Sequence, residues 1–256
     1  MKKSKYLIIV MISIISLFIA IVVFTGTNQY LFGKINLLST HIPSYIWENL
    51  TFLGDALAAC AFLVLFIRKR PDLVWSGLIA GIIGVVIVSL LKAFFSMSRP
   101  PLVFGTESIN IIGPTLYHHS FPSGHTVTIF IVSGILIFYF RSMIIKSAIL
   151  LIAFSVGISR IAVGVHWPLD VLAGALIGSL CALTGLIIVK KSGLSFNRPA
   201  QITCGIILIL LNSFLLIFYD TQYPQASYLK YFLAGVTLII GIKEFFLLLK
   251  KSDQIA

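Results

Sequence analysis

Residues 146–189 read KSAILLIAFSVGISRIAVGVHWPLDVLAGALIGSLCALTGLIIV, two long apolar runs joined by a short polar stretch. A bilayer core about 30 Å thick takes roughly 20 residues of α-helix, so the runs at 146–164 and 169–189 each have the length of a membrane-spanning helix. Pro168 suits the first turn of the second helix, because the amide hydrogen that proline lacks would make no hydrogen bond within the helix at that position. The stretch therefore predicts a helical hairpin in a membrane, with the polar residues between 159 and 170 at its turn.

The same apolar pattern extends over the rest of the chain. Its 256 residues are 59% hydrophobic and 11% charged, with a mean hydropathy of +1.06. A soluble domain could not cover so much apolar surface, whereas lipid can. The predicted fold class is therefore all-α, a polytopic membrane helix bundle that forms a single integral membrane domain over residues 1–256. We expect eight spans, near residues 6–24, 51–67, 73–91, 125–140, 146–164, 169–189, 201–219 and 227–249.

The first apolar run follows Lys2, Lys3 and Lys5, as the core of a signal peptide would. Its length suits a complete span, and the sequence FTGTN at its end lacks a small-x-small cleavage site. We therefore expect a retained membrane helix.

The net charge of +11 could suggest a nucleic-acid partner, but the positions of the charges indicate membrane topology. When the N-terminus is placed inside, 14 of the 19 lysines and arginines fall at the cytoplasmic ends of the eight spans. This asymmetry is the positive-inside rule, and it predicts that both termini are cytoplasmic. Five basic residues fall on the outer side instead: Lys34, Lys92, Arg99, Arg160 and Lys230.

Three polar clusters are brought to the outer side by this topology. They are Lys92–Pro100 (KAFFSMSRP), 121–125 (FPSGH) and 159–170 (SRIAVGVHWPLD). Arginine matches phosphate oxygens with two parallel donors, and lysine adds a compact positive charge. Ser123 and Gly124 precede a predicted helix, whose free amide groups and dipole favour an anion. The clusters together predict a phosphate-binding site formed by Lys92, Arg99, Ser123, Gly124 and Arg160.

Two histidines and a carboxylate could supply the chemistry at this site. Asp170 lies in the first turn of the span that follows His166, so its carboxylate can fix one imidazole nitrogen and leave the other free to attack phosphorus. His125, at the start of another span, could protonate the leaving oxygen as a general acid. The sequence shows no carboxylate cluster for magnesium near these residues, so we expect no metal and no cofactor.

The spacings Lys-x6-Arg-Pro, Pro-Ser-Gly-His and Ser-Arg-x5-His-x3-Asp resemble the signature of the type-2 phosphatidic acid phosphatase superfamily. That family includes bacterial phosphatidylglycerophosphate, undecaprenyl-diphosphate and lipid A phosphatases, as well as vanadium haloperoxidases. The resemblance implies that Lys92, Arg99, Ser123, Gly124 and Arg160 bind phosphate. It also implies that His166 is the nucleophile, Asp170 its orienting partner and His125 the acid.

The family core has six membrane helices, so the resemblance divides this chain into a six-span catalytic core at 1–191 and an additional C-terminal helical hairpin at 200–251. The hairpin carries no strong polar constellation, and no function follows for it from the resemblance.

The function that we expect is hydrolysis of a membrane lipid phosphate or diphosphate through a phosphohistidine, at the outer face of a bacterial plasma membrane. Undecaprenyl diphosphate is the favoured substrate, followed by phosphatidylglycerol phosphate and phosphatidic acid. A lipid phosphotransferase or a lipid A phosphatase on the same scaffold, or a non-catalytic lipid-binding or transport protein, stays as an alternative. The expected partners are the lipid substrate and the bilayer, with no nucleic acid and no obligate protein.

Several polar residues near the clusters have two interpretations. Asp55 is either an intramembrane acid or, preferably, the first residue of a helix. His118 and His119 are expected to be surface groups, and Trp167 an interfacial aromatic. Ser159 could bind a phosphate oxygen or cap a helix.

Overall fold

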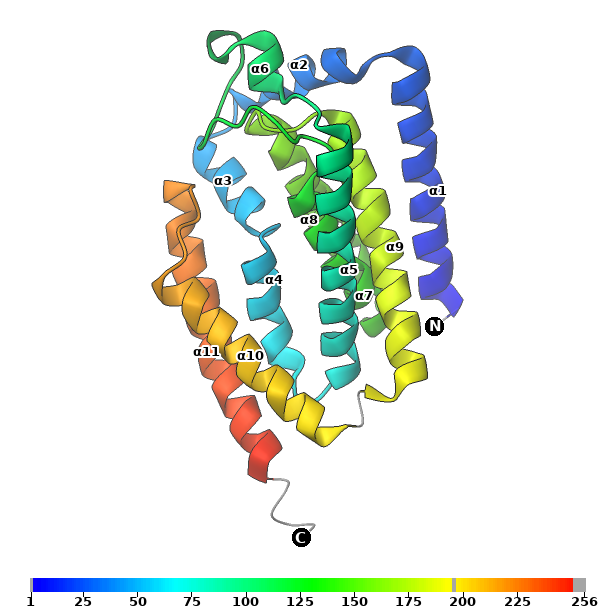
Figure 1. Cartoon of the computed structure of the whole chain (residues 1–256), viewed down its shortest axis with the longest axis vertical. Helices are drawn as coiled ribbons and strands as arrows, with labels where there is room; N and C mark the ends of the chain where they lie inside the picture. Colours follow the sequence, from blue (N-terminus) through cyan, green and yellow to red (C-terminus); the bar gives the residue numbers. More distant parts are fainter. Residues whose placement is uncertain (1, 195–196, 251–256) are drawn as a thin grey trace.

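The apolar runs fold into helices that cross the molecule in alternating directions (Figure 1). A computed structural model describes residues 2–194 and 197–250 of the chain. Its main helices are α1 (Lys2–Thr25), α4 (Ala56–Leu63) with η1 (Val64–Phe66), α5 (Pro71–Phe95), α7 (Gly124–Tyr139), α8 (Met143–Ala162), α9 (Pro168–Ser192), α10 (Arg198–Ile217) and α11 (Ser227–Lys250). Seven of the eight predicted spans coincide with one of these helices, and the predicted all-α membrane bundle is confirmed.

The helices differ in how completely they could cross a bilayer. Six of them in the described part of the chain are long and apolar enough to do so, namely α1, α5, α8, α9, α10 and α11. Helix α7 is apolar but has only 16 residues. It is therefore shorter than the roughly 20 residues that a bilayer core takes.

The expected span at 51–67 is wrong as a continuous helix. It consists of the end of α3 (Ser44–Phe52) and of α4 with η1, and the two parts meet at an angle of 60°. The first part ends at Phe52, and Asp55 caps the second, because its carboxylate accepts a hydrogen bond from the amide of Leu57 at 2.8 Å. Asp55 is thus the helix-start residue that the sequence favoured. Gly54 permits the bend to lie against α7, since a Cβ there would be 3.0 Å from the Cβ of His125.

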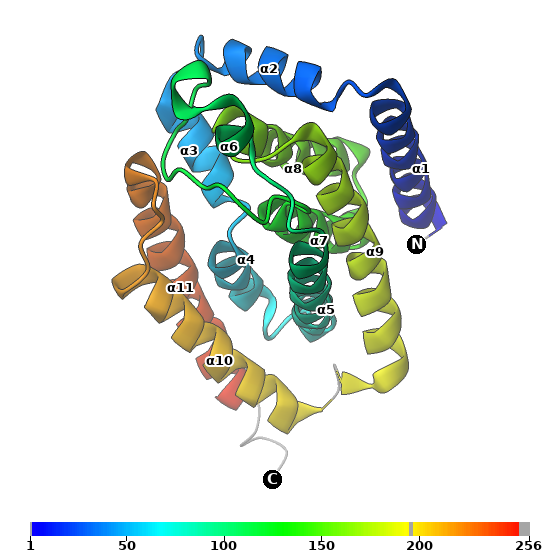
Figure 2. The same ribbon diagram turned by 45° about the horizontal axis from the view of Figure 1, so that its top comes forward.

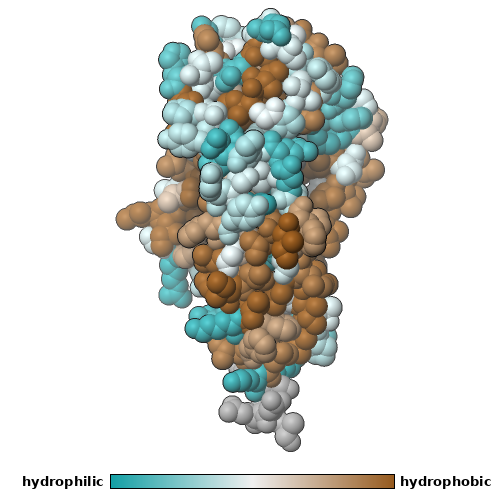
Figure 3. Space-filling model, turned by 90° about the vertical axis from the view of Figure 1, so that its left-hand side faces the viewer, coloured by the Kyte–Doolittle hydropathy of each residue, from teal (hydrophilic) through white to brown (hydrophobic). Residues whose placement is uncertain are grey.

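Short helices gather at one end of the bundle, above the long ones in Figure 1 and facing the viewer in Figure 2. They are α2 (Asn28–Ser39), α3, α6 (Pro100–Phe104) and η2 (Thr106–Ser108). The face drawn in Figure 3 is largely polar toward this end and mostly hydrophobic below it. This distribution fits a bundle that is surrounded by lipid and covered by a polar cap.

Helix α9 packs at the centre, against α7 and α5. Its small residues allow close approach of the backbones. A Cβ on Gly178 would lie 2.5 Å from the carbonyl oxygen of Val127, and one on Gly174 would lie 2.7 Å from that of Ser123. The second contact fixes the start of α7 beside the start of α9, which is where two of the polar clusters lie.

The last two helices form a hairpin that packs against α4. Their connection, 218–226, includes the short helix η4 (Pro224–Ala226) and lies at the same end of the molecule as α3. The division into a core at 1–191 and an added hairpin at 200–251 stays a prediction, and Lys251 lies outside the described residues.

Candidate active site

The three sequence clusters meet at the capped end of the bundle. Lys92 lies in the last turn of α5, Arg99 directly before α6, and Arg160 in the last turn of α8. Ser123 is the N-cap residue of α7, and the segment from His166 to Asp170 leads into α9. Arg99, Ser123, Arg160, His166 and Asp170 are all at most 7% exposed.

The loop before α7 holds two of the cations through its backbone. The side chain of Lys92 donates a hydrogen bond to the carbonyl oxygen of His119 at 2.7 Å. Arg99 donates from Nε to the carbonyl of His118 at 2.8 Å and from Nη2 to that of His119 at 3.3 Å. His118 and His119 thus contribute their carbonyls to the site, while their side chains are exposed, as expected.

His166 and Asp170 are in direct contact. The Nδ1 atom of His166 lies 3.1 Å from Oδ2 of Asp170, so the neutral imidazole carries its hydrogen on Nδ1 and its lone pair on Nε2. The same carboxylate oxygen accepts a hydrogen bond from the amide of Trp167 at 2.9 Å. Nη1 of Arg99 lies 3.4 Å from Nε2 of His166 and also donates to the carbonyl of Val165 at 2.9 Å. The free nitrogen of His166 therefore faces a cation that could bind phosphate.

A tight turn places His166 beside Arg160. The carbonyl of Arg160 accepts hydrogen bonds from the amides of Val165 at 3.3 Å and His166 at 3.2 Å. Gly164 in this turn has a φ of +83°, and a Cβ there would lie 2.6 Å from the carbonyl oxygen of Asn110. Only glycine meets both conditions without strain.

His166 lies in this turn, between the membrane-spanning parts of α8 and α9. Burial lowers its pKa well below the ordinary value, and the positive charges of Arg99 and Arg160 lower the pKa further. The imidazole is therefore neutral near pH 7, which is the form with a lone pair available for attack.

The start of α7 presents amide groups and a gap in the packing. The amides of Gly124 and His125 open the helix, where no preceding turn supplies acceptors. A Cβ on Gly124 would meet only Val88, at 3.9 Å, so the space beside this backbone is open. Ser123 itself is fully buried, and its hydroxyl accepts a hydrogen bond from Thr126 at 2.9 Å.

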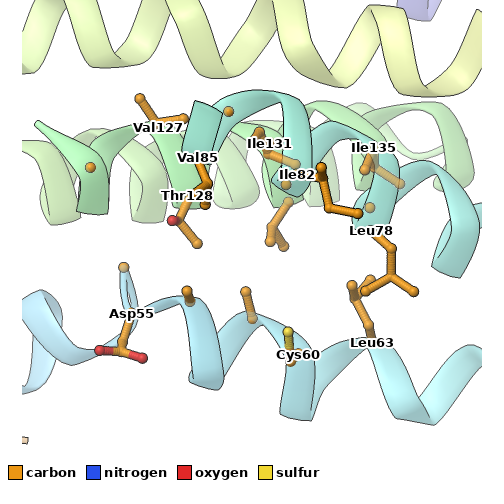
Figure 4. Close-up of a pocket in the computed structure, with 18 of the residues that line it drawn as sticks. Asp55, Cys60, Leu63, Leu78, Ile82, Val85, Val127, Thr128, Ile131 and Ile135 are labelled. Atoms are coloured by element: carbon orange, nitrogen blue, oxygen red, sulfur yellow. The ribbon is translucent and has the colours of Figure 1, made fainter. Parts of the chain in front are cut away.

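An apolar cavity of about 580 Å³ begins at this point and runs between α4, α5 and α7. Gly124 and His125 line its polar end, and Val85, Thr128 and Ile131 line it farther along (Figure 4). Its wall continues onto the outer surface of α5, where Ile82 is 66% and Val85 62% exposed. The cavity thus connects the polar cluster with the side of the bundle that faces lipid.

Sequence reasoning missed some members of the site. The buried hydroxyl of Ser120 donates to Oδ2 of Asp170, and Tyr223 contacts Arg160 from the C-terminal hairpin. Ser120 lies in the polar run directly before Pro-Ser-Gly-His, and this pattern could have indicated that it belongs to the site. No pattern in the sequence indicated Tyr223.

Two other residues are placed differently from the simplest expectation. Trp167 is buried instead of interfacial, and its indole donates to the carbonyl of Ser98 at 2.8 Å. The hydroxyl of Ser159 donates to the carbonyl of Val156 at 2.7 Å and lies 2.9 Å from the hydroxyl of Thr51, so it joins α8 to α3.

Within residues 2–194 and 197–250, no cluster of three or more His, Cys, Asp or Glu side chains could hold a metal ion.

Comparisons with known proteins agree with the predicted family. The family model described as the PAP2 superfamily matches residues 72–194. The bacitracin transport permease protein BcrC of Bacillus licheniformis is 39% identical over 118 residues, which are 45% of this chain and only about half, 55%, of that relative. Undecaprenyl-diphosphatase BcrC of Bacillus subtilis is 30% identical over 157 residues, which are 59% of this chain and 78% of the relative.

A solved structure is similar over nearly its whole length. The crystal structure of Aquifex aeolicus LpxE superposes with a TM-score of 0.55 and 33% sequence identity, covering 62% of this chain and 94% of that one. The family model spans the helices that carry the three motifs. From the family match, the relatives and the shared fold together, the chain belongs to the PAP2 superfamily.

Proposed function

We propose that the protein is a membrane lipid phosphatase, and that its preferred substrate is an isoprenyl diphosphate of the undecaprenyl type. One observation carries the proposal. Gly124 and His125 line the apolar cavity, and the amide of Ser123, directly before them, donates to the carbonyl of Asp170 at 3.1 Å, so the cavity begins beside the His166–Asp170 pair. A phosphate bound among the cations would therefore place the rest of its molecule against apolar side chains.

The cavity favours a lipid over a soluble phosphate ester. A sugar or nucleotide would have to place polar groups between α4, α5 and α7 without hydrogen-bond partners, at a cost of a few kcal/mol for each group. A hydrocarbon chain gains about 25 cal/mol for every Å² that it buries. The relative from Bacillus subtilis is named an undecaprenyl-diphosphatase, which supports a long isoprenyl chain.

We infer a two-step reaction. Nε2 of His166 attacks the terminal phosphorus, and the bond from phosphorus to the leaving oxygen breaks while His125 protonates that oxygen. Water then attacks the phosphohistidine with His125 as the base, the P–N bond breaks, and inorganic phosphate leaves. Lys92, Arg99 and Arg160 would balance the charge on the phosphoryl oxygens, and the amides at the start of α7 would add donors.

Phosphate release from undecaprenyl and farnesyl diphosphate by the purified full-length protein, in detergent with EDTA, tests the proposal. We expect turnover in EDTA, and we expect His166→Ala to lower kcat by at least about 10³-fold, because it removes the attacking atom. The matched control is His41→Ala, a histidine between α2 and α3 whose side chain is exposed, and it should retain activity. Full activity of the His166→Ala protein would exclude the phosphohistidine.

A further inference from the structure

The turn between the last two helices reaches the candidate active site. Tyr223 in this turn is 5% exposed and packs among residues of the core, including Trp47, Phe52 and Val165. It also fits closely against Gly113 in the loop before α7, where a Cβ would lie 2.5 Å from the tyrosine ring. Tyr223 is therefore enclosed by residues of the catalytic half of the chain.

The hydroxyl of Tyr223 contacts the guanidinium of Arg160. Nη1 of Arg160 donates a hydrogen bond to this hydroxyl oxygen at 3.0 Å, and the guanidinium carbon lies 5.9 Å from the centre of the tyrosine ring. Arg160 is 3% exposed and belongs to the cluster that we assign to phosphate. The contact thus links the added hairpin to a group that would bind substrate.

Two donors at this contact have no acceptor among the described residues. Nε of Arg160 is buried without a hydrogen-bond partner. The Tyr223 hydroxyl accepts from Arg160, and the described residues offer no acceptor for its own hydrogen. Buried donors are normally satisfied, so a pair of them beside a cationic cluster indicates an anion as the missing partner.

Polar contacts, of which two are partly buried and one is buried, hold the turn in place. Tyr219 donates to the carboxylate of Asp55, and the amide of Gln225 donates to Oε2 of Glu48 at 2.9 Å. Within the turn, the hydroxyl of Thr221 donates to the carbonyl of Tyr223 at 2.8 Å. Because α3 and α4 supply these carboxylates, the position of Tyr223 is fixed relative to the core.

We propose that Tyr223 is a positioning residue of the phosphate site, which orients the Arg160 guanidinium and donates its own hydroxyl hydrogen to a bound phosphoryl group. The C-terminal hairpin would then complete the site. This inference rests on the proposed function for its substrate, but the binding of phosphate can be measured separately.

Tyr223→Phe removes the hydroxyl and keeps the ring. A hydrogen bond to a charged group contributes roughly 1.5–3 kcal/mol, so we expect the Kd for inorganic phosphate and orthovanadate to rise about tenfold or more. Calorimetric titration of the full-length protein in detergent measures both. We also expect kcat/KM to fall by a similar factor, and we expect the loss to shrink in an Arg160→Lys background, since Tyr223 acts through Arg160.

Tyr219→Phe is the matched control, because it removes a hydroxyl from the same turn that contacts Asp55 and not Arg160. Its phosphate affinity should stay within about twofold of the parent, whereas equal losses in both variants would show that the turn acts only by docking. Unchanged affinity in Tyr223→Phe would also overturn the proposal.

Gly113→Ala supplies a second variant if the Tyr223→Phe protein does not fold. Its methyl group would displace the ring of Tyr223, which keeps its hydroxyl group in this variant. If the Gly113→Ala protein unfolds at a temperature near that of the parent, it should bind phosphate more weakly than the parent does. An unchanged phosphate affinity in this variant would contradict the proposal. A parent protein that binds phosphate through Tyr223 but hydrolyses no lipid phosphate would contradict the proposed function alone.

Discussion

Asp170 carries the greatest number of site contacts on a single atom. Its Oδ2 receives hydrogen bonds from the His166 ring, the Ser120 hydroxyl and the Trp167 amide. An amide in place of the carboxylate could keep its oxygen at the position of Oδ2 and its NH2 group at that of Oδ1, which has no hydrogen-bond partner among the described residues, but it would lose the negative charge. The charge of this side chain therefore stabilises a positive charge on His166.

We expect Asp170→Asn to lower kcat by roughly 10³- to 10⁴-fold with little change in KM, because the imidazole would lose the negative charge that stabilises the positive charge it gains when Nε2 attacks. Steady-state kinetics on a prenyl diphosphate measure both constants. Asp72→Asn is the control, since that carboxylate pairs with Arg70 at the opposite end of α5 and is 42% exposed. A decrease of less than tenfold in the Asp170 variant would mean that Asp170 does not stabilise the charge on the nucleophile.

The lowered pKa of His166 predicts the pH dependence. Burial and the charges of Arg99 and Arg160 disfavour the imidazolium, so the neutral nucleophile persists below the ordinary pKa of 6.5. The acidic limb of kcat/KM should therefore lie below pH 6.5, where protonation of His166 abolishes attack. In Arg99→Gln the limb should move to higher pH, because a positive neighbour is lost. Because both proteins are measured with the same substrate, ionisation of the substrate affects both profiles equally. A shift of the acidic limb to lower pH in Arg99→Gln would refute the assignment of this limb to His166.

Residues such as His166 and Asp170 could be placed from the sequence because they stand four positions apart with a helix start between them. Ser120 and the carbonyls of His118 and His119 could not, since an irregular loop has no periodicity from which to derive contacts. Tyr223 meets Arg160 across 63 residues of sequence, in a contact that depends on how the hairpin packs. Tertiary packing of this kind leaves no local pattern.

At the scale of elements, the break between α3 and α4 shapes the cavity. Helix α4 begins at Ala56, directly after Gly54 and its N-cap residue Asp55, and thereby turns its small residues toward α5 and α7. Hydropathy predicted one straight span here, because apolar composition does not reveal a bend that a cap and a close helix contact impose. The beginning of the cavity thus depends on two residues that a hydropathy profile overlooks.

We expect Val85→Trp to discriminate between substrates by chain length. The indole would occupy part of the cavity about 10 residues from the phosphate end of α5, so kcat/KM should fall about tenfold for undecaprenyl diphosphate and little for a short, soluble phosphate ester. Ile14→Trp on α1 is the control, since Ile14 is 49% exposed on another helix. Equal decreases in kcat/KM for both substrates would show that the cavity does not bind the lipid chain.

At the scale of the whole molecule, the candidate site and the short helices α2, α3, α6 and η2 lie at one end, away from the start of α1 and the end of α11 (Figure 1). The positive-inside rule would place the site outside the cell, because the loops at the other end carry Arg68, Lys69, Arg70, Lys190 and Lys191. An outward site suits a diphosphate that is presented at the outer leaflet, since a headgroup held there need not cross the bilayer before hydrolysis.

Cysteine labelling in spheroplasts tests this orientation. Glu107→Cys places a thiol on η2 at the site end, and Lys191→Cys places one at the end of α9; both positions are exposed. A membrane-impermeant maleimide should label the first in intact spheroplasts and the second only after permeabilisation. The parent protein measures the background from Cys60, Cys181 and Cys204, which lie in apolar helices. The reverse pattern would place the site in the cytoplasm, and a phosphatase of outer-leaflet lipid would then be excluded while the chemistry of His166 would stand.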